Sequence, residues 1–154
     1  MTDPEPRVVA AFYEQVWGLL KVSYGEAVYL RGAGPEHHVV VLRPGSQAAV
    51  VGYSLGLADR ATVDAAAEEL QRRADTAIVA GPGILDQPGG GYGFSILDPD
   101  GRELVVSAEV AAAPDRADTE GGPPIRPTKI SHLVLNSPNV DNYSELLIDA
   151  FGFQ

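Results

Sequence analysis

The chain has 154 residues, 45% of them hydrophobic and 21% charged, and its formal net charge is −10 at pH 7. This length and apolar content suffice for one ordinary domain with a core, and no run reaches the roughly 18 to 20 apolar residues of a membrane helix. The acidic charge argues against nucleic acid as a partner, and the absence of cysteine excludes disulfides and thiolate chemistry. We therefore expect a cytoplasmic protein, without membrane or nucleic-acid partners, in which His, Asp and Glu bind any metal.

The first part of the chain predicts one helix and three short strands. Apolar residues recur every three or four positions and predict an amphipathic helix from Pro6 to Trp17, which ends at Gly18. We expect two strands in KVSYGEAVYLRG, with a turn at Gly25-Glu26. A third strand is expected in HHVVVLRPG.

The next part repeats this order with a strand placed before the helix. QAAVVGYSLGL is typical of a strand, and the stretch from Thr62 to Ala74 predicts a second amphipathic helix. Three more strands are expected in TAIVAGPGIL, GYGFSIL and RELVVSAEV. The last two are joined by DPDG, a composition suited to a tight turn.

The C-terminal part predicts a linker and the opening of a second unit. Residues 111–127 are rich in proline, glycine and charge, which is typical of a linker. After it we expect a strand in KISHLVL and a helix that begins at Ser137-Pro138 and stops at Gly152.

Residues 2–20 and 136–154 align weakly at a constant offset of 134. The second copy follows a strand, whereas the first follows only Met1. The sequence therefore predicts that the first strand of the N-terminal unit is missing, that the second unit is unfinished and that both ends are cut. The KISHLVL strand could pair where the missing strand belongs, within its own chain or in a neighbour, so we expect a homo-oligomer that includes a strand-swapped dimer.

The ordered set FYEQVWGL, YLRGAGPEHHVVVLR, DPDGRELVVSAEV and ISHLVLNS resembles the vicinal oxygen chelate superfamily. In particular it resembles the N-terminal module, and the start of the C-terminal one, of two-domain type I extradiol dioxygenases. Glyoxalase-like and bleomycin-resistance proteins are relatives. The resemblance implies an α+β fold in which paired βαβββ motifs form a curved mixed sheet. It also implies an N-terminal module over 1–110, a linker over 111–127 and the first strand and helix of a second module over 128–154.

The resemblance also implies a metal centre. In this family Fe(II), sometimes Mn(II), lies in the C-terminal module and is held by two histidines and one glutamate, which leaves positions where a catecholate and O2 bind. The N-terminal module has Val50 at a histidine position and Val105 at the glutamate position, so the resemblance implies that it is metal-free. His132 matches the first histidine ligand of the C-terminal module, with its partners expected beyond Gln154. We therefore expect no stable metal on this chain alone.

For His132 the competing interpretation is a strand histidine with a local hydrogen bond. His37 and His38 are a weaker candidate. Because neighbouring side chains of a strand point to opposite faces, only one of them, taken as His38, could serve as a ligand. The competing interpretation is an ordinary strand pair with one solvated ring, although a swapped KISHLVL strand would bring His132 near His38 and make an adventitious two-histidine site.

Three functions follow as hypotheses. The first is part of an extradiol ring-cleaving dioxygenase that acts on catechol-type aromatics with non-haem Fe(II) and O2, with this chain alone inactive. The second is a metal-free small-molecule-binding protein of the bleomycin-resistance or glyoxalase-like type. The third is a module that has lost its activity. We favour the first as lineage, and whether this chain is itself an enzyme stays uncertain.

Overall fold

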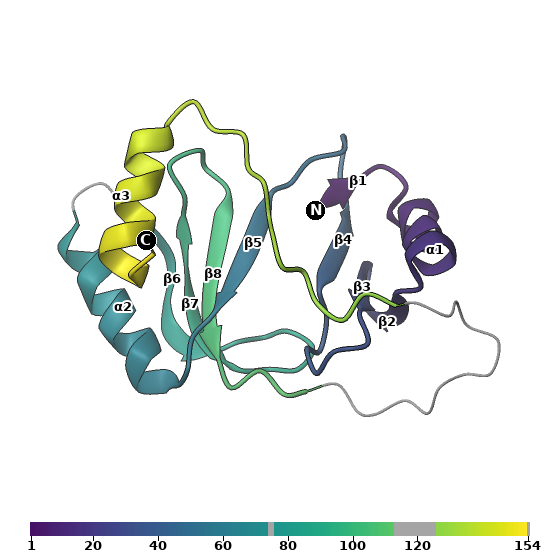
Figure 1. Ribbon diagram of the computed structural model, residues 1–154, viewed down its shortest axis with the longest axis horizontal. Helices are drawn as coiled ribbons and strands as arrows, with labels where there is room; N and C mark the ends of the chain where they lie inside the picture. The colour runs from purple at the N-terminus through teal and green to yellow at the C-terminus, as the bar shows by residue number, and fades with distance from the viewer. Residues whose placement is uncertain (74–75, 113–125, 154) are drawn as a thin grey trace. The chain divides into compact units, whose positions relative to one another are not determined.

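The computed structural model describes residues 1–73, 76–112 and 126–153, and the chain divides into two compact units. Unit 1 comprises residues 1–50 and 111–133, and unit 2 comprises residues 51–110 and 134–154. Each unit has its own four-stranded mixed sheet with helical cover (Figure 1). The predicted α+β fold of paired βαβββ motifs is confirmed. Most of the predicted linker, 111–127, lies outside the described residues.

The sheet of unit 1 has the strand order β1-β4-β3-β2. Its strands are β1 (Thr2–Asp3), β2 (Leu20–Tyr24), β3 (Ala27–Arg31) and β4 (Val40–Pro44). β1 runs parallel to β4, and the other neighbours are antiparallel. The predicted hairpin at Gly25-Glu26 is confirmed, whereas the third strand begins only at Val40 and so excludes both histidines that were assigned to it.

The prediction that the first strand is missing is wrong. β1 is short, but it pairs with β4 from the first residues of the chain: Arg43 N–H donates to Met1 O over 2.9 Å, and Gly45 N–H donates to Asp3 O over 3.0 Å. Two residues are too few to show an alternating side-chain pattern, so this strand left no signal in the sequence.

The KISHLVL segment is not a strand in this structure. Residues 128–135 have no regular secondary structure, although Ala33 N–H donates to Pro127 O over 2.9 Å and Gly34 N–H to Thr128 O over 3.0 Å. β1 pairs with the end of β4, at the sheet edge where KISHLVL was expected to pair. The replacement of the first strand by KISHLVL is therefore not confirmed.

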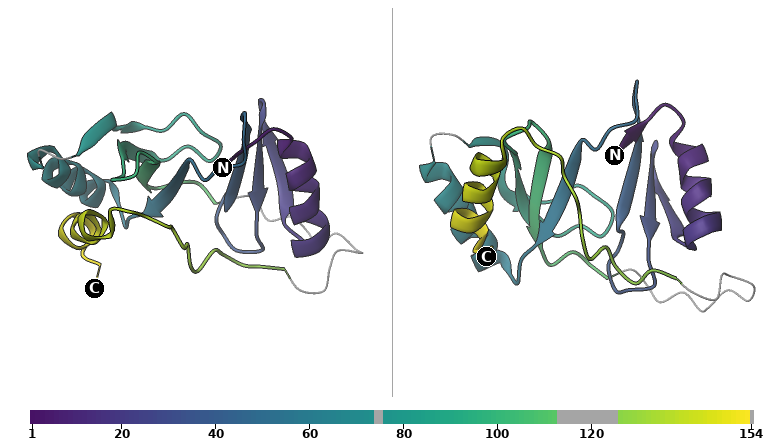
Figure 2. Two further views of the ribbon diagram at one scale, coloured as in Figure 1. Left: turned by 90° about the horizontal axis from the view of Figure 1, so that it is seen from above. Right: turned by 45° about the horizontal axis from the view of Figure 1, so that its top comes forward.

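Helix α1 (Pro6–Trp17) has the predicted bounds. Pro6 suits the first turn, where a backbone N–H would have no helical partner, and Gly18 ends the helix in the left-handed conformation at φ 68°. The helix lies along one face of the unit 1 sheet (Figure 2). The buried apolar residues between them are Ala10, Leu19, Val28, Leu30 and Leu42.

Gly18→Ala is expected to lower the free energy of unfolding of unit 1 by about 1 kcal/mol, because an alanine is strained in the left-handed conformation. Urea unfolding followed by the fluorescence of Trp17, the one tryptophan of the chain, measures the change. Gly81→Ala is the control, since an added Cβ there meets nothing within 4 Å. Equal losses by circular dichroism in both variants would contradict this explanation.

The sheet of unit 2 has the strand order β5-β8-β7-β6. Its strands are β5 (Gly52–Gly56), β6 (Ala77–Ile84), β7 (Tyr92–Leu97) and β8 (Glu103–Ala108). β5 runs parallel to β8, and the other pairs are antiparallel. The edge strand β6 has two register shifts against β7, on either side of Ala80, and its residues 77–82 are exposed.

Helix α2 (Arg60–Arg72) packs on this sheet and against helix α3 (Val140–Phe151), as Figure 1 shows. The core residues of unit 2 are Val63, Ala66, Ala67, Leu70, Phe94, Ile96, Leu104, Val106, Ala108 and Leu146. α2 begins two residues earlier than predicted, because the Asp59 side chain accepts a hydrogen bond from Thr62 N–H over 2.8 Å and caps the helix. It ends at Arg72, and the predicted end, Ala74, lies outside the described residues.

The start of α3 also differs from the prediction. The helix begins at Val140 instead of Ser137-Pro138, because the Ser137 hydroxyl accepts a hydrogen bond from Asn139 N–H over 2.9 Å and forms a turn before the helix. Its end at Gly152, with φ 68°, is confirmed. Within the described part of the chain, no helix has the length and apolarity needed to cross a bilayer.

Candidate functional site

A cluster of polar side chains in unit 2 joins the turn between β7 and β8 to helix α3. Asp98 is 4% exposed, and its Oδ1 accepts hydrogen bonds from the backbone N–H groups of Asp100 (2.9 Å) and Arg102 (2.8 Å). Its Oδ2 accepts from Arg102 Nε over 3.0 Å and from the Tyr143 hydroxyl. The Tyr143 hydroxyl is in turn 2.6 Å from that of Tyr53. We call these residues the Asp98 network.

The network continues to the start of α3 through Asp100. Its Oδ1 accepts from the Ser137 hydroxyl over 3.0 Å and from Asn139 Nδ2 over 2.9 Å, and its Oδ2 pairs with Arg102. The DPDG turn therefore presents two carboxylates to one helix end. Every polar contact in this set is made within unit 2, so the arrangement can anchor α3 on the sheet.

The pKa values fix which groups of the network carry charge. Burial by itself would raise the pKa of Asp98, but the hydrogen bonds from Tyr143, Arg102 and the Asp100 backbone outweigh it and hold that pKa below its usual value. Burial, with the hydrogen bond to Asp98, raises the pKa of Tyr143. At neutral pH, Asp98 is thus ionised and Tyr143 is a neutral donor. Asp98 therefore keeps its negative charge and Tyr143 keeps its proton near neutral pH. This suits an anchor better than proton transfer by either group.

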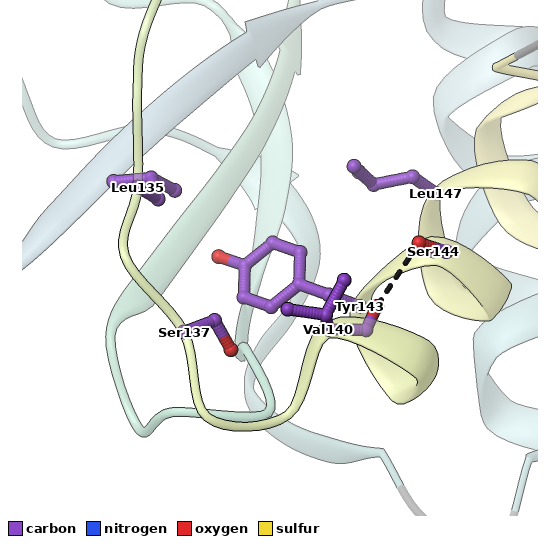
Figure 3. A pocket seen from close by; sticks show the side chains of 6 residues that line it. All are labelled: Leu135, Ser137, Val140, Tyr143, Ser144 and Leu147. Carbon is purple, nitrogen blue, oxygen red and sulfur yellow. Dashed lines mark hydrogen bonds between the residues drawn. The ribbon is translucent and has the colours of Figure 1, made fainter.

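A small pocket of about 190 Å³ adjoins this network. Figure 3 shows it beside the Tyr143 ring. Its lining residues are Leu135, Ser137, Val140, Tyr143, Ser144 and Leu147. The Ser144 hydroxyl donates to Val140 O over 3.0 Å, and the Ser137 hydroxyl donates to Asp100. Because these hydroxyls already have partners, the pocket is suited to a small and largely apolar group.

The predicted metal ligand His132 is exposed. Its Nδ1 lies 3.1 Å from the Ser131 hydroxyl oxygen. Among the described residues, no three His, Asp or Glu side chains gather in a way that could hold a metal ion. The ligand role of His132 therefore stays a prediction.

His37 and His38 lie in the loop before β4. The expectation that they point to opposite faces of a strand is therefore wrong, since neither belongs to a strand. Their Nδ1 atoms are 3.2 Å apart, and the His38 ring packs edge-on against Tyr29 with centroids 4.9 Å apart. Burial, and next the charge of His37, lower the pKa of His38 to about 4. The ring of His38, the second metal-ligand candidate, therefore has the ring of His37 as a polar partner.

The two valines at the family's ligand positions, Val50 and Val105, belong to different units. Val105 is on β8 and, by strand alternation, shares a face with Glu103, opposite the buried Leu104. Val50 is an exposed residue that precedes β5.

The sequence did not reveal the Asp98 network, although DPDG marked its turn, because Tyr143 lies 45 positions from Asp98.

The low pKa of His38 predicts a pH dependence of stability. The unfolded histidine has a pKa near 6.5 and the folded one about 4, so the unfolded chain binds more protons between these values. Stability is therefore expected to fall as the pH drops from about 6.5 to about 4. Urea midpoints measured across this range test it. The plot of stability against pH should be flatter for His38→Gln than for the wild type, and His132→Gln should have the slope of the wild type. Equal slopes in all three proteins would contradict the prediction.

No model of a protein family and no curated protein matches the chain. Among solved structures, the chain is similar to a Mn(II)-bound glyoxalase from Novosphingobium aromaticivorans, with 36% identity, a TM-score of 0.85 and coverage of 99% of this chain and 50% of that one. It is also similar to the 2,3-dioxygenase LapB from Pseudomonas sp. KL28, with 16% identity, a TM-score of 0.78 and coverage of 98% and 56%. A third match is BphC, a halotolerant catechol dioxygenase, with 17% identity, a TM-score of 0.71 and coverage of 99% and 53%.

The chain thus spans about half the length of each of these three structures. The two dioxygenases share too few residues with it to show more than the fold. The glyoxalase shares over a third of the aligned residues across nearly the whole chain. This chain therefore has the fold of the vicinal oxygen chelate superfamily, as its sequence resemblance predicts.

Proposed function

We propose that this chain forms the metal-free half of a cytoplasmic, metal-dependent enzyme of the vicinal oxygen chelate superfamily. The Asp98 network carries the proposal, because it ties α3, the expected opening helix of a second module, to the turn between β7 and β8 by charged hydrogen bonds. The likeness to a Mn(II)-bound glyoxalase supports the metal dependence of the whole enzyme. In this role the chain positions a partner module.

The substrate class that we propose is a catechol-type aromatic, cleaved next to its hydroxyls with O2 by an enzyme that holds non-haem Fe(II) or Mn(II). The family resemblance supports this choice, and the fold shared with two dioxygenases is consistent with it. Among the described residues His132 does not have the two further ligands that such an ion requires, so the metal does not fit here and we derive no catalytic step on this chain.

Oxygen uptake tests this proposal. The chain is loaded anaerobically with Fe(II) or Mn(II), freed of excess metal, and supplied with catechol in an oxygen electrode. We expect no catechol-dependent uptake above the buffer blank, in the wild type as in His132→Ala. Ring cleavage by the wild type that is abolished in His132→Ala would overturn the proposal, because it would mean that a complete site forms around His132.

The pocket beside Tyr143 favours a second candidate function, the metal-free binding of a small molecule. Catechol is titrated into the chain without metal while the amide NMR signals of Tyr143 and Leu147 are followed. Saturable shifts that disappear in Leu147→Trp, which fills the pocket, would favour binding. Shifts that persist in this variant would place the ligand elsewhere and reject the pocket as its site.

The homo-oligomer, with its strand-swapped dimer, remains part of the proposal. Its support is the exposure of three apolar residues in the KISHLVL segment, where Ile130 is 54%, Leu133 51% and Val134 86% exposed. Sedimentation velocity at rising protein concentration should then show a dimer. Leu133→Asp should shift the equilibrium to the monomer, and a monomer in both proteins at every concentration would end this part of the proposal.

A further inference from the structure

The loop between β3 and β4 of unit 1 brings two imidazole nitrogens within coordination distance of a common point. His37 Nδ1 and His38 Nδ1 are 3.2 Å apart. Zinc–imidazole bonds are about 2.0–2.1 Å long, so two ligand nitrogens lie about 2.9 Å apart at a right angle and about 3.3–3.4 Å apart at a tetrahedral angle. The observed separation falls between these values, so one ion can reach both nitrogens without moving them apart.

The backbone on both sides of the pair is fixed. Val39 N–H donates to Leu30 O over 2.7 Å directly after the histidines, and Gly34 N–H donates to Thr128 O over 3.0 Å before them. The His38 ring also packs edge-on against the buried ring of Tyr29. The two rings are therefore held together before any ion arrives, which reduces the ordering entropy that binding would otherwise cost.

The protonation states also suit a ligand pair. When the two rings are hydrogen-bonded to each other, the Nδ1–H of one ring donates to the Nδ1 of the other, so one Nδ1 already presents its lone pair to the neighbouring ring. On binding, the Nδ1 proton of the donor ring is exchanged through solvent for one on its Nε2. Both Nδ1 atoms then have free lone pairs, and no net proton is released.

We propose that His37 and His38 form a bidentate chelate for a divalent transition-metal ion, with Cu(II) bound most tightly and water completing the coordination. Imidazole nitrogens suit copper, nickel and zinc, and the general order of affinities places copper above zinc and far above manganese and iron. The site is separate from the family's iron or manganese centre and involves neither Val50 nor Val105. It is independent of the function proposed above, since the oxygen-uptake test uses neither these residues nor copper.

Copper binding to the whole chain tests the proposal. The chain has three histidines and no cysteine. His132 is the only histidine outside the proposed pair, so a single variant at this position serves as the control. After dialysis against Cu(II) at a low free concentration, we expect one retained copper per chain in the wild type and in His132→Ala. His37→Ala and His38→Ala should each lose it. Copper that is lost in His132→Ala, or retained in the double variant His37→Ala/His38→Ala, would overturn the proposal.

Because His38 packs on Tyr29, its replacement can disturb the fold. A second measurement therefore uses the wild type alone. In the ¹⁵N-labelled chain titrated with Zn(II), the Nδ1 signals of both His37 and His38 should move to metal-bound values while His132 stays unchanged. A response of one ring alone, or of His132 instead, would contradict bidentate binding even if every variant folds poorly.

Discussion

Asp98→Ala is expected to lower the free energy of unfolding of unit 2 by about 3–5 kcal/mol, the range found when one partner of a buried ion pair is removed. The Asp98 side chain is fully buried, and that of Arg102 is 17% exposed. The change leaves the Arg102 guanidinium and the Tyr143 hydroxyl without their shared acceptor. Urea unfolding followed by far-UV circular dichroism measures the loss.

The same variant tests the anchoring of α3. Hydrogen exchange of the amides of residues 143–151 should accelerate in Asp98→Ala more than exchange in β8, because α3 loses its hydrogen bond to the turn. Asp86→Asn, which neutralises an exposed carboxylate in the loop after β6, is the control and should leave both unchanged. A uniform acceleration over all of unit 2 would mean that Asp98 supports the whole fold and is no specific anchor.

The pH dependence of this contribution follows from its sign. Because the pKa of Asp98 is lower in the folded protein than in the unfolded chain, its stabilisation is complete above the ordinary aspartate pKa and is lost as the pH falls through the folded value. The difference in stability between the wild type and Asp98→Asn should therefore shrink below about pH 4. A difference that stays constant into strong acid would contradict an ionised Asp98.

Phe94→Ala should lower the free energy of unfolding of unit 2 by about 3–5 kcal/mol. Phe94 on β7 is 1% exposed and belongs to the core that joins the sheet to α2 and α3. Its neighbours lie on rigid strands and helices that cannot fully collapse into the space of the lost ring, so a cavity adds to the loss of apolar burial. Chemical denaturation, with the midpoint and the slope fitted separately, gives the measurement.

Phe153→Ala is the matched control, because this ring lies in the same unit but is 49% exposed. It should cost less than about 1 kcal/mol, as surface substitutions usually do. Similar losses in the two phenylalanine variants would contradict the placement of Phe94 in the core.

The sequence predicted those elements whose signals are local. α1 combines a proline in the first turn, an apolar face of helical period and a glycine end, and it was predicted with its observed bounds. The hairpin of β2 and β3 and the strands β7 and β8 are short, largely apolar segments with strong turn sequences between them. For such elements, side-chain pattern and backbone preference agree, so the tertiary structure has nothing to override.

The features that the sequence did not reveal depend on contacts between distant residues. β1 exists because β4 offers backbone partners to the first residues of the chain, and such pairing leaves no mark on side-chain types. His37 and His38 looked like part of a strand because valines follow them, yet β4 starts at Val40. The Asp98 network requires the folded chain to bring Tyr143 to the turn.

The edge strand β6 also bears on how the protein behaves at high concentration. An exposed edge can recruit a strand from another molecule and so begin the growth of aggregates. Pro82 in β6 has no N–H to donate, and the register shifts on either side of Ala80 bend the strand away from an even row of donors and acceptors. A second chain that approached this edge would find donors and acceptors out of regular order, which opposes the growth of fibres from the β6 edge of the unit 2 sheet.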